Sequence, residues 1–301
     1  MSVATLIKRS TARLLIPLLL SLQIAMPASG RDLEEIRQSG VLRHLGAPYA
    51  HFVTGSGDGL DVELITLFAE YLGVQYRFVE TNWKDVIADL SGKKFVVHGE
   101  NVEITGNAPV RGDLIANGLT VIPWRKALIS YSNPTFISGV WLLTKAEYNM
   151  SPIRGSSDMQ RDIADVKAGL KGRELFGVAN TCLDPQLYNL AATGARVKLY
   201  QPPSDNPVEL IPALLSGEAE TILLDIPDAL VALEKWPERI KVIGPVSMPQ
   251  EMGVGFAKES VELRKAFDTF FEQIKRDGRY LALLRKYFPG MSSYFNEFFS
   301  G

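Results

Sequence analysis

The chain has 301 residues, enough for two compact domains, and its hydrophobic content of 46% allows each domain to bury a core. A formal net charge of −2 and the lack of any basic patch argue against nucleic-acid binding. The three histidines and one cysteine show no metal-ligand spacing, and no G-x-S-x-G, H-E-x-x-H or phosphate-loop motif occurs. We therefore expect neither a metal nor a cofactor.

Residues 1–30 have the layout of a secretory signal peptide. Three basic residues precede the apolar run "LLIPLLLSLQIAM", and small residues follow it up to Gly30. The run is too short for a retained membrane anchor, and no cysteine follows it to carry a lipid. An exported protein whose only cysteine is Cys182 has no internal disulfide and fits a bacterial periplasm. We expect the mature chain to begin near Arg31.

The first half of the mature chain alternates strand and helix patterns. Residues 61–73, "DVELITLFAEYLG", repeat apolar side chains at helical spacing and stop at a glycine. The other predictions here are strands at "GVLRHLGA", "VQYRFVE" and "DLIANGLTV" and a helix at "NWKDVIADLSG". Between that helix and the last strand, residues of about 92–112 alternate around "HGEN", which predicts an inserted β-hairpin.

The second half repeats part of this plan. Strands are predicted at "ELFGVAN", "RVKLY" and "AETILLD", with helices at "CLDPQLYNLAATG" and "NPVELIPALLSG". The segments "DVIADLSG" and "ELIPALLSG" each lead into a strand, which suggests two similar α/β lobes.

The last sixty residues contain two amphipathic helices, "VELRKAFDTFFEQIKRDG" and "RYLALLRKYF", too few to form a third domain. If they return to the first lobe, the chain crosses between lobes twice, at roughly 139–144 and 251–256. Two crossing strands make a hinge, and the cleft between the lobes becomes a ligand site.

Polar side chains follow several predicted strands, where α/β sheets bind ligands. Arg125 lies just past the strand "LTVI", so it either grips a carboxylate through two parallel hydrogen bonds or is an ordinary surface arginine. Asp225 either caps the next helix or binds an ammonium group in the cleft, and Asp228 has the same two possibilities. Thr181, with Asp184 three residues later, resembles a capping box at a helix N-terminus, which attracts a carboxylate.

Aromatic residues gather near the predicted strand ends and loops: Tyr49, Phe52, Trp83 and Trp124. Each alone is more often part of a core, but together they suggest an aromatic-lined cleft. Cys182 falls in the predicted first turn after Thr181. No histidine is near it in sequence, so we interpret it as structural rather than nucleophilic.

Over nearly all of its mature length the chain resembles the periplasmic solute-binding proteins of family 3, the polar amino-acid-binding type of ABC importers. The blocks that carry the resemblance are "GVLRHLGAPYAHF", "GLDVELITLFAEYLGV", "NWKDVIADLSG", "GLTVIPWRKALISYSNPTF", "GVANTCLDPQLY", "LLDIPDALV" and "RDGRYLALLRKYF". No single block is decisive, but their order and spacing together are specific.

The resemblance implies roles for the charged candidates. In the family, the arginine of a T-x-x-R block just before an FS-x-PY block binds the ligand α-carboxylate. Arg125, followed by "YSNPT", matches it. Asp225 matches the acid that binds the α-ammonium group, and Thr181 matches a threonine that helps to hold the carboxylate. The chain departs from the pattern at Ile122, where the family has a hydroxyl, and at Asn180, where glycine is usual.

The resemblance also implies roles for uncharged residues. Asn117, Gly118 and Thr120 match the strand that supplies backbone contacts, and Tyr49 and Trp83 match aromatics that pack on the ligand. The implied fold class is α/β, a two-lobed periplasmic-binding-protein fold of type II with two crossing strands as the hinge. Lobe 1 would comprise residues 31–140 and 252–301, with the hairpin inserted at about 92–112, and lobe 2 residues 141–251.

The implied function is capture of an amino acid or related carboxylate for import by an ABC permease in the inner membrane, without catalysis, by a periplasmic monomer. Two alternatives stay open. One is a dehydratase-like enzyme on the same fold, in which Asp228 would stand where the family enzyme has a catalytic glutamate. The other is an accessory protein of a periplasmic dehydrogenase that keeps the fold but binds no ligand.

Overall fold

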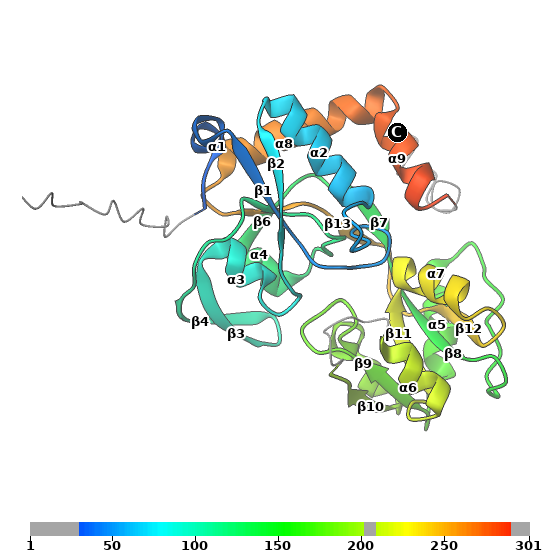
Figure 1. The fold of residues 1–301 in the computed structure, drawn as a ribbon. Coiled ribbons are helices and arrows are strands. Elements are labelled where there is room, and N and C mark those ends of the chain that lie inside the picture. Colours follow the sequence, from blue (N-terminus) through cyan, green and yellow to red (C-terminus); the bar gives the residue numbers. More distant parts are fainter. Residues whose placement is uncertain (1–29, 202–208, 290–301) are drawn as a thin grey trace, which may run out of the picture.

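The computed structural model describes residues 30–201 and 209–289, which form two lobes joined by extended segments (Figure 1). The predicted signal peptide lies outside the described residues. Within the described ranges, no helix has both the length and the apolar character needed to cross a membrane.

The first lobe is built on a five-stranded mixed sheet in the order β2-β1-β5-β14-β6. Strand β1 pairs in parallel with β2 and β5, and β14 pairs antiparallel with β5 and β6. These strands are β1 (Val41–Gly46), β2 (Gln75–Glu80), β5 (Leu114–Ile115), β6 (Ile129–Tyr131) and β14 (Gly255–Ala257). The helices of this lobe are α1 (Leu33–Ser39), α2 (Leu60–Leu72), α3 (Val86–Ser91), α4 (Pro123–Leu128), α8 (Val261–Arg276) and α9 (Arg279–Tyr287).

The second lobe has a sheet in the order β10-β9-β11-β8-β12, again with three parallel strands followed by two antiparallel pairings. Its strands are β8 (Val140–Lys145), β9 (Glu174–Gly177), β10 (Arg196–Leu199), β11 (Thr221–Asp225) and β12 (Ile240–Pro245). Its helices are α5 (Met159–Ala168), α6 (Leu210–Ser216) and α7 (Ile226–Lys235). Because both sheets follow one plan, with α3 preceding β5 and α6 preceding β11, the similarity of the two lobes suggested by the sequence is observed.

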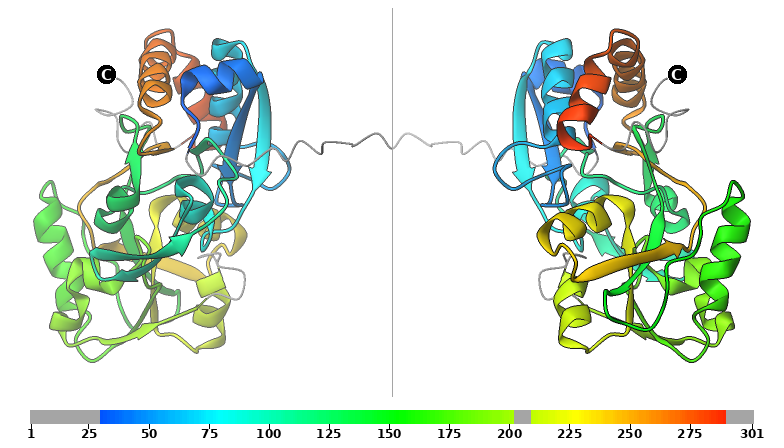
Figure 2. Two further views of the ribbon diagram at one scale, coloured as in Figure 1. Left: turned by 90° about the vertical axis from the view of Figure 1, so that its left-hand side faces the viewer. Right: turned by 90° about the vertical axis from the view of Figure 1, so that its right-hand side faces the viewer.

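The lobes are connected where β7 (Phe136–Ser138) pairs antiparallel with β13 (Gln250–Met252). Figure 2 shows the two lobes from two further sides. The prediction for the first crossing, roughly residues 139–144, was wrong by a few residues. Those residues belong to β8, which pairs on both sides within the second sheet. An apolar run is compatible both with a buried central strand and with the crossing segment that precedes it, so the sequence could not tell which residues form the crossing.

The C-terminal helices α8 and α9 pack on α2 of the first lobe. Phe267 of α8 meets Phe68 of α2 edge to face, with ring centroids 5.2 Å apart. Phe271 packs against Tyr280 of α9 at 4.8 Å. The apolar stripe that repeats at helical spacing along residues 261–276 thus faces the core, where its burial stabilises the lobe.

Strands β3 (Lys93–His98) and β4 (Asn101–Asn107) pair as an antiparallel hairpin between α3 and β5. The hairpin rests on α4 of the same lobe, where the rings of Phe95 and Trp124 lie 5.5 Å apart. Alternate residues of β3 are half-buried and exposed, so one face packs and the other is solvated.

The helix predicted for residues 182–194 is not an α-helix. Two short 3₁₀ segments stand there, η1 (Pro185–Tyr188) and η2 (Leu190–Thr193). Asn189 between them has φ 52°, in the left-handed region, which interrupts any continuous helix. The residue that caps η1 is Asp184, whose carboxylate accepts from the backbone N–H of Gln186, rather than Thr181 as expected.

Candidate functional site

The carboxyl ends of the parallel strands of both sheets point toward the space between the lobes. Tyr49 and Trp83 follow β1 and β2 of the first lobe, Thr181 follows β9 of the second, and Asp225 ends β11. One narrow cavity of about 40 Å³ is lined by residues of both lobes. The lining residues are Tyr49, Trp83, Gly118, Thr120, Arg125, Val178, Thr181, Cys182, Leu183 and Asp225. Of the eight residues that the family resemblance assigns to ligand binding, seven therefore line this cavity, and Asn117 does not.

Asp225 has the first of the two roles that its position in sequence allowed, the capping of the next helix. As the N-cap of α7, its Oδ1 accepts from the backbone N–H of Asp228 at 3.1 Å. Its Oδ2 accepts a hydrogen bond from the hydroxyl of Tyr49, which crosses between the lobes. A buried carboxylate with one oxygen facing the other lobe is placed to receive a further hydrogen-bond donor from a ligand.

Asp225 and Asp228 form a buried acidic pair without a neighbouring lysine or arginine ion-pair partner among the described residues. Burial raises the pKa of Asp225 from its ordinary value of 3.8 to about 7. Burial, and then the charge of Asp225, raise the pKa of Asp228 well above its ordinary value. Both carboxyl oxygens of Asp228 are buried without a hydrogen-bond partner among the described residues, and Asp228 does not line the narrow cavity.

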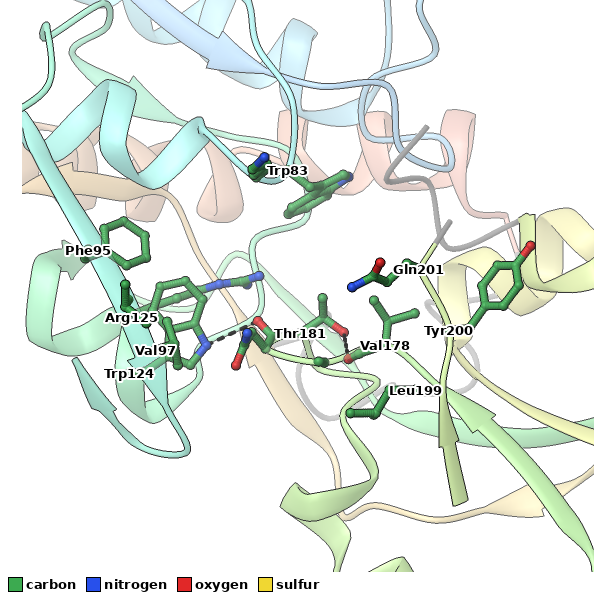
Figure 3. A pocket seen from close by; sticks show the side chains of 14 residues that line it. Trp83, Phe95, Val97, Trp124, Arg125, Val178, Thr181, Leu199, Tyr200 and Gln201 are labelled. Atoms are coloured by element: carbon green, nitrogen blue, oxygen red, sulfur yellow. Dashed lines mark hydrogen bonds between the residues drawn. The ribbon is translucent and has the colours of Figure 1, made fainter. Parts of the chain in front are cut away.

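Arg125 brings a buried positive charge to the opposite side of the cavity. Its side chain is 5% exposed, and its Nη1 donates to the carbonyl of Thr120 at 3.1 Å. The guanidinium carbon lies 5.8 Å from the ring centroid of Trp83 and 5.5 Å from that of Trp124 (Figure 3). Its Nε has no acceptor, and no carboxylate pairs with it, among the described residues. Burying a guanidinium without an anion is costly, so this environment favours an anionic ligand group.

The strand predicted to end just before Arg125 was wrong. Residues 119–122 lie outside the sheet except for an isolated bridge between Thr120 and Met252, and Arg125 is the third residue of α4. The chain turns at Gly118, whose φ is 62° and whose N–H donates to the buried carboxylate of Asp61 at 2.7 Å. A Cβ at this glycine would lie within 2.7 Å of the Tyr49 ring, so only glycine fits the close approach.

Thr181 and Cys182 line the cavity from the second lobe. The hydroxyl of Thr181 donates to the carbonyl of Val178 at 2.8 Å and accepts from the N–H of Leu183 at 3.0 Å, which holds the loop after β9. The Sγ of Cys182 lies 3.9 Å from Oδ2 of Asp225. Burial raises the pKa of the thiol, so the thiolate is disfavoured here.

Asn117 is fully buried, and neither polar atom of its side-chain amide has a hydrogen-bond partner among the described residues. Sequence reasoning missed Val178 and Leu183, because apolar side chains after a strand look like core. It also missed the contact in which Nε1 of Trp124 donates to the carbonyl of Asn180 across the lobes at 3.2 Å. A backbone carbonyl leaves no trace in the sequence. Within the described ranges, no group of three or more His, Cys, Asp or Glu residues is placed to hold a metal ion.

The family model for bacterial extracellular solute-binding proteins, family 3, matches residues 103–290, more than half of the chain. The chain belongs to this family. The L-cystine-binding protein TcyJ of Escherichia coli (strain K12) is 26% identical to this solute-binding protein over 234 residues, which cover 78% of this chain and 75% of TcyJ.

Two solved structures resemble this family member in fold. An ancestral arginine-binding protein bound to arginine gives a TM-score of 0.64 at 21% identity, covering 83% of this chain and 98% of its own. The ancestral amino acid-binding protein AncCDT-1, described as a precursor of cyclohexadienyl dehydratase, gives a TM-score of 0.63 at 22% identity. The match covers 85% of this chain and 98% of AncCDT-1. At these identities the likeness concerns the fold alone, and it confirms the two-lobed α/β fold predicted from the sequence.

Proposed function

We propose that this solute-binding protein captures an amino acid or a related carboxylate between its lobes and delivers it to an ABC permease of the inner membrane. The observation that carries the proposal is the pairing of two buried groups of opposite charge, Arg125 and Asp225, which line one cavity from opposite lobes. An amino acid carries a carboxylate and an ammonium group on one carbon, so both charges of its head group find a partner. The cystine-binding relative supports this ligand class.

In this proposal the ligand head group contacts both lobes. The carboxylate binds Arg125 and the hydroxyl or backbone of Thr181, and the ammonium group binds Asp225 beside the Tyr49 hydroxyl. Thr120 and Gly118 border the same cavity, and Trp83 covers one side of it. Ligand contacts to both lobes favour the arrangement in which the lobes are together, which is how binding would signal to a permease.

The proposal includes export and a domain division. Residues 1–30 would be removed, and the mature monomer would act in the periplasm. Its first lobe would comprise residues 31–140 and 252–301, with residues 141–251 as the second. The division is supported by the two separate sheets. N-terminal sequencing of the exported protein should read from near Arg31; a chain that still begins at Met1 would contradict this part.

We propose binding without catalysis. The dehydratase-like alternative needs an acid near Asp225 that reaches the ligand, and Asp228 is the residue in that position. Its carboxyl group is fully buried and does not border the cavity that holds the other candidates. A general acid must lie within hydrogen-bond reach of the group that it protonates, so this placement favours a structural role for Asp228.

The test is to identify the ligand and then to locate it. Mass spectrometry of protein purified from its native host should detect a bound amino acid or small carboxylate. Because Cys182 is the only cysteine and lines the narrow cavity, its alkylation by iodoacetamide reports on that cavity. The identified compound should slow alkylation of Cys182 in the native protein and leave the rate in urea unchanged. If no amino acid or small carboxylate is found or bound, the accessory-protein alternative is favoured.

A further inference from the structure

A second, much wider cavity of about 790 Å³ adjoins the narrow one. The two share four lining residues: Trp83, Arg125, Val178 and Thr181. The narrow cavity, about 40 Å³, has room for only about three water-sized groups. That space fits a head group but no large side chain. If the head group binds as proposed above, the remainder of the ligand passes the shared residues and enters the wide cavity.

The walls of the wide cavity come from both lobes and are mainly apolar or aromatic (Figure 3). Strand β3 of the hairpin and helix α4 form one side, and the end of β10 forms the other. The residues that supply the apolar surface are Phe95, Val96, Val97, Trp124, Leu199 and Tyr200. Val97 is only half-buried and Leu199 is 50% exposed, although both are large apolar side chains. Contact with an apolar ligand group would remove both from water, which is favourable.

Among the described residues, both charged side chains that line the wide cavity are positive. Lys84 and Arg125 are its charged lining residues, and no carboxylate is among the described residues that border it. Asp225 borders only the narrow cavity, where it is placed for the ammonium group. A positively charged ligand side chain in the wide cavity would therefore meet two like charges, which disfavours it.

We infer that this protein selects a ligand with a large, uncharged aromatic or apolar side chain, and that the β3–β4 hairpin forms the wall that recognises it. This inference rests on the proposed function, because the head group fixes where the side chain begins. The hairpin residues act by contact and shape, and the positive charges of Lys84 and Arg125 disfavour cationic side chains.

Titration calorimetry on the mature protein with four L-amino acids tests the selectivity. Tryptophan and phenylalanine should bind at least tenfold more tightly than alanine, because each buries more apolar surface, and also more tightly than arginine. If arginine or alanine binds as tightly as tryptophan, the inference is wrong while the proposed function stands. If none of the four binds, the inference is overturned, and the proposed function is decided by the ligand that mass spectrometry identifies.

A matched set of variants tests the wall itself. Val97→Asp and Leu199→Asp place a carboxylate in the wide cavity from opposite lobes, since Val97 is on the same face of β3 as Phe95. Each should weaken tryptophan binding about tenfold and strengthen arginine binding, because the new charge needs a partner. Ile104→Asp is the control, since Ile104 is 55% exposed on β4 of the same hairpin and does not line the cavity. Thermal melts establish that all three fold. If Val97→Asp and Leu199→Asp leave the ratio of the tryptophan affinity to the arginine affinity unchanged, as the control should, neither wall contacts the ligand side chain.

Discussion

Replacing Asp225 by Asn should stabilise the ligand-free protein at alkaline pH and have little effect near pH 4. The side chain is 2% exposed, and burial raises its pKa from 3.8 to about 7. Between these two values the folded state binds the proton more tightly than the unfolded state, so stability falls as pH rises through this window. Well above pH 7 Asp225 is ionised, and the destabilisation caused by its buried charge is complete. A shift of about three units corresponds to about 4 kcal/mol at most. Asparagine keeps the acceptor that caps α7 but carries no charge.

The measurement is the difference in thermal midpoint between variant and parent at each pH from 4 to 8. Asp61 is also buried with its pKa raised to about 7, but both proteins contain it, so its contribution cancels. For a chain of this size the gain at pH 8 should be roughly 10 °C. The control is Asp158→Asn, the same change at the exposed cap of α5, which should alter stability by less than about 0.5 kcal/mol. A variant of Asp225 that is no more stable than the parent at pH 8 would refute the argument.

Three other predictions concern binding and local fit. Arg125→Lys keeps the charge but loses the planar fork, so affinity for a carboxylate ligand should fall roughly thirtyfold, about 2 kcal/mol, in calorimetry; an unchanged affinity would remove Arg125 from the site. Affinity for an amino acid should fall by up to about tenfold per pH unit below pH 7, because the ammonium group binds ionised Asp225; proton release measured in buffers of different ionisation enthalpy checks this. A profile that is flat from pH 5 to 8 would contradict it. Gly118→Ala should destabilise the protein by about 1–3 kcal/mol in urea unfolding, because its Cβ would collide with the rings of Phe52 and Tyr49; an unaltered midpoint would contradict the close packing.

Local patterns predicted much of the fold because they depend on near neighbours along the chain. The apolar spacing of residues 61–73 predicted α2, which the structure places at Leu60–Leu72, and the alternation of residues 92–112 predicted the β3–β4 pairing. Where a local pattern was compatible with two structures, the prediction was wrong. The run "CLDPQLYNLAATG" has apolar residues at helical spacing, yet Asn189 in the left-handed region divides it into 3₁₀ turns.

The candidate site also combines features that the sequence predicted with features that only the tertiary structure decided. Residue types and family resemblance picked out Arg125 and Asp225, because an isolated charge beside a predicted strand end is visible in the sequence. Only the tertiary structure brought them to one cavity and joined Asp225 to Tyr49, 176 residues away. It alone decided that Arg125 has no carboxylate beside it among the described residues, and that the hairpin and the end of β10 line one wide cavity. Burial, and the charge balance of a cavity, arise from segments far apart in the chain, so no spacing within a single segment can encode them.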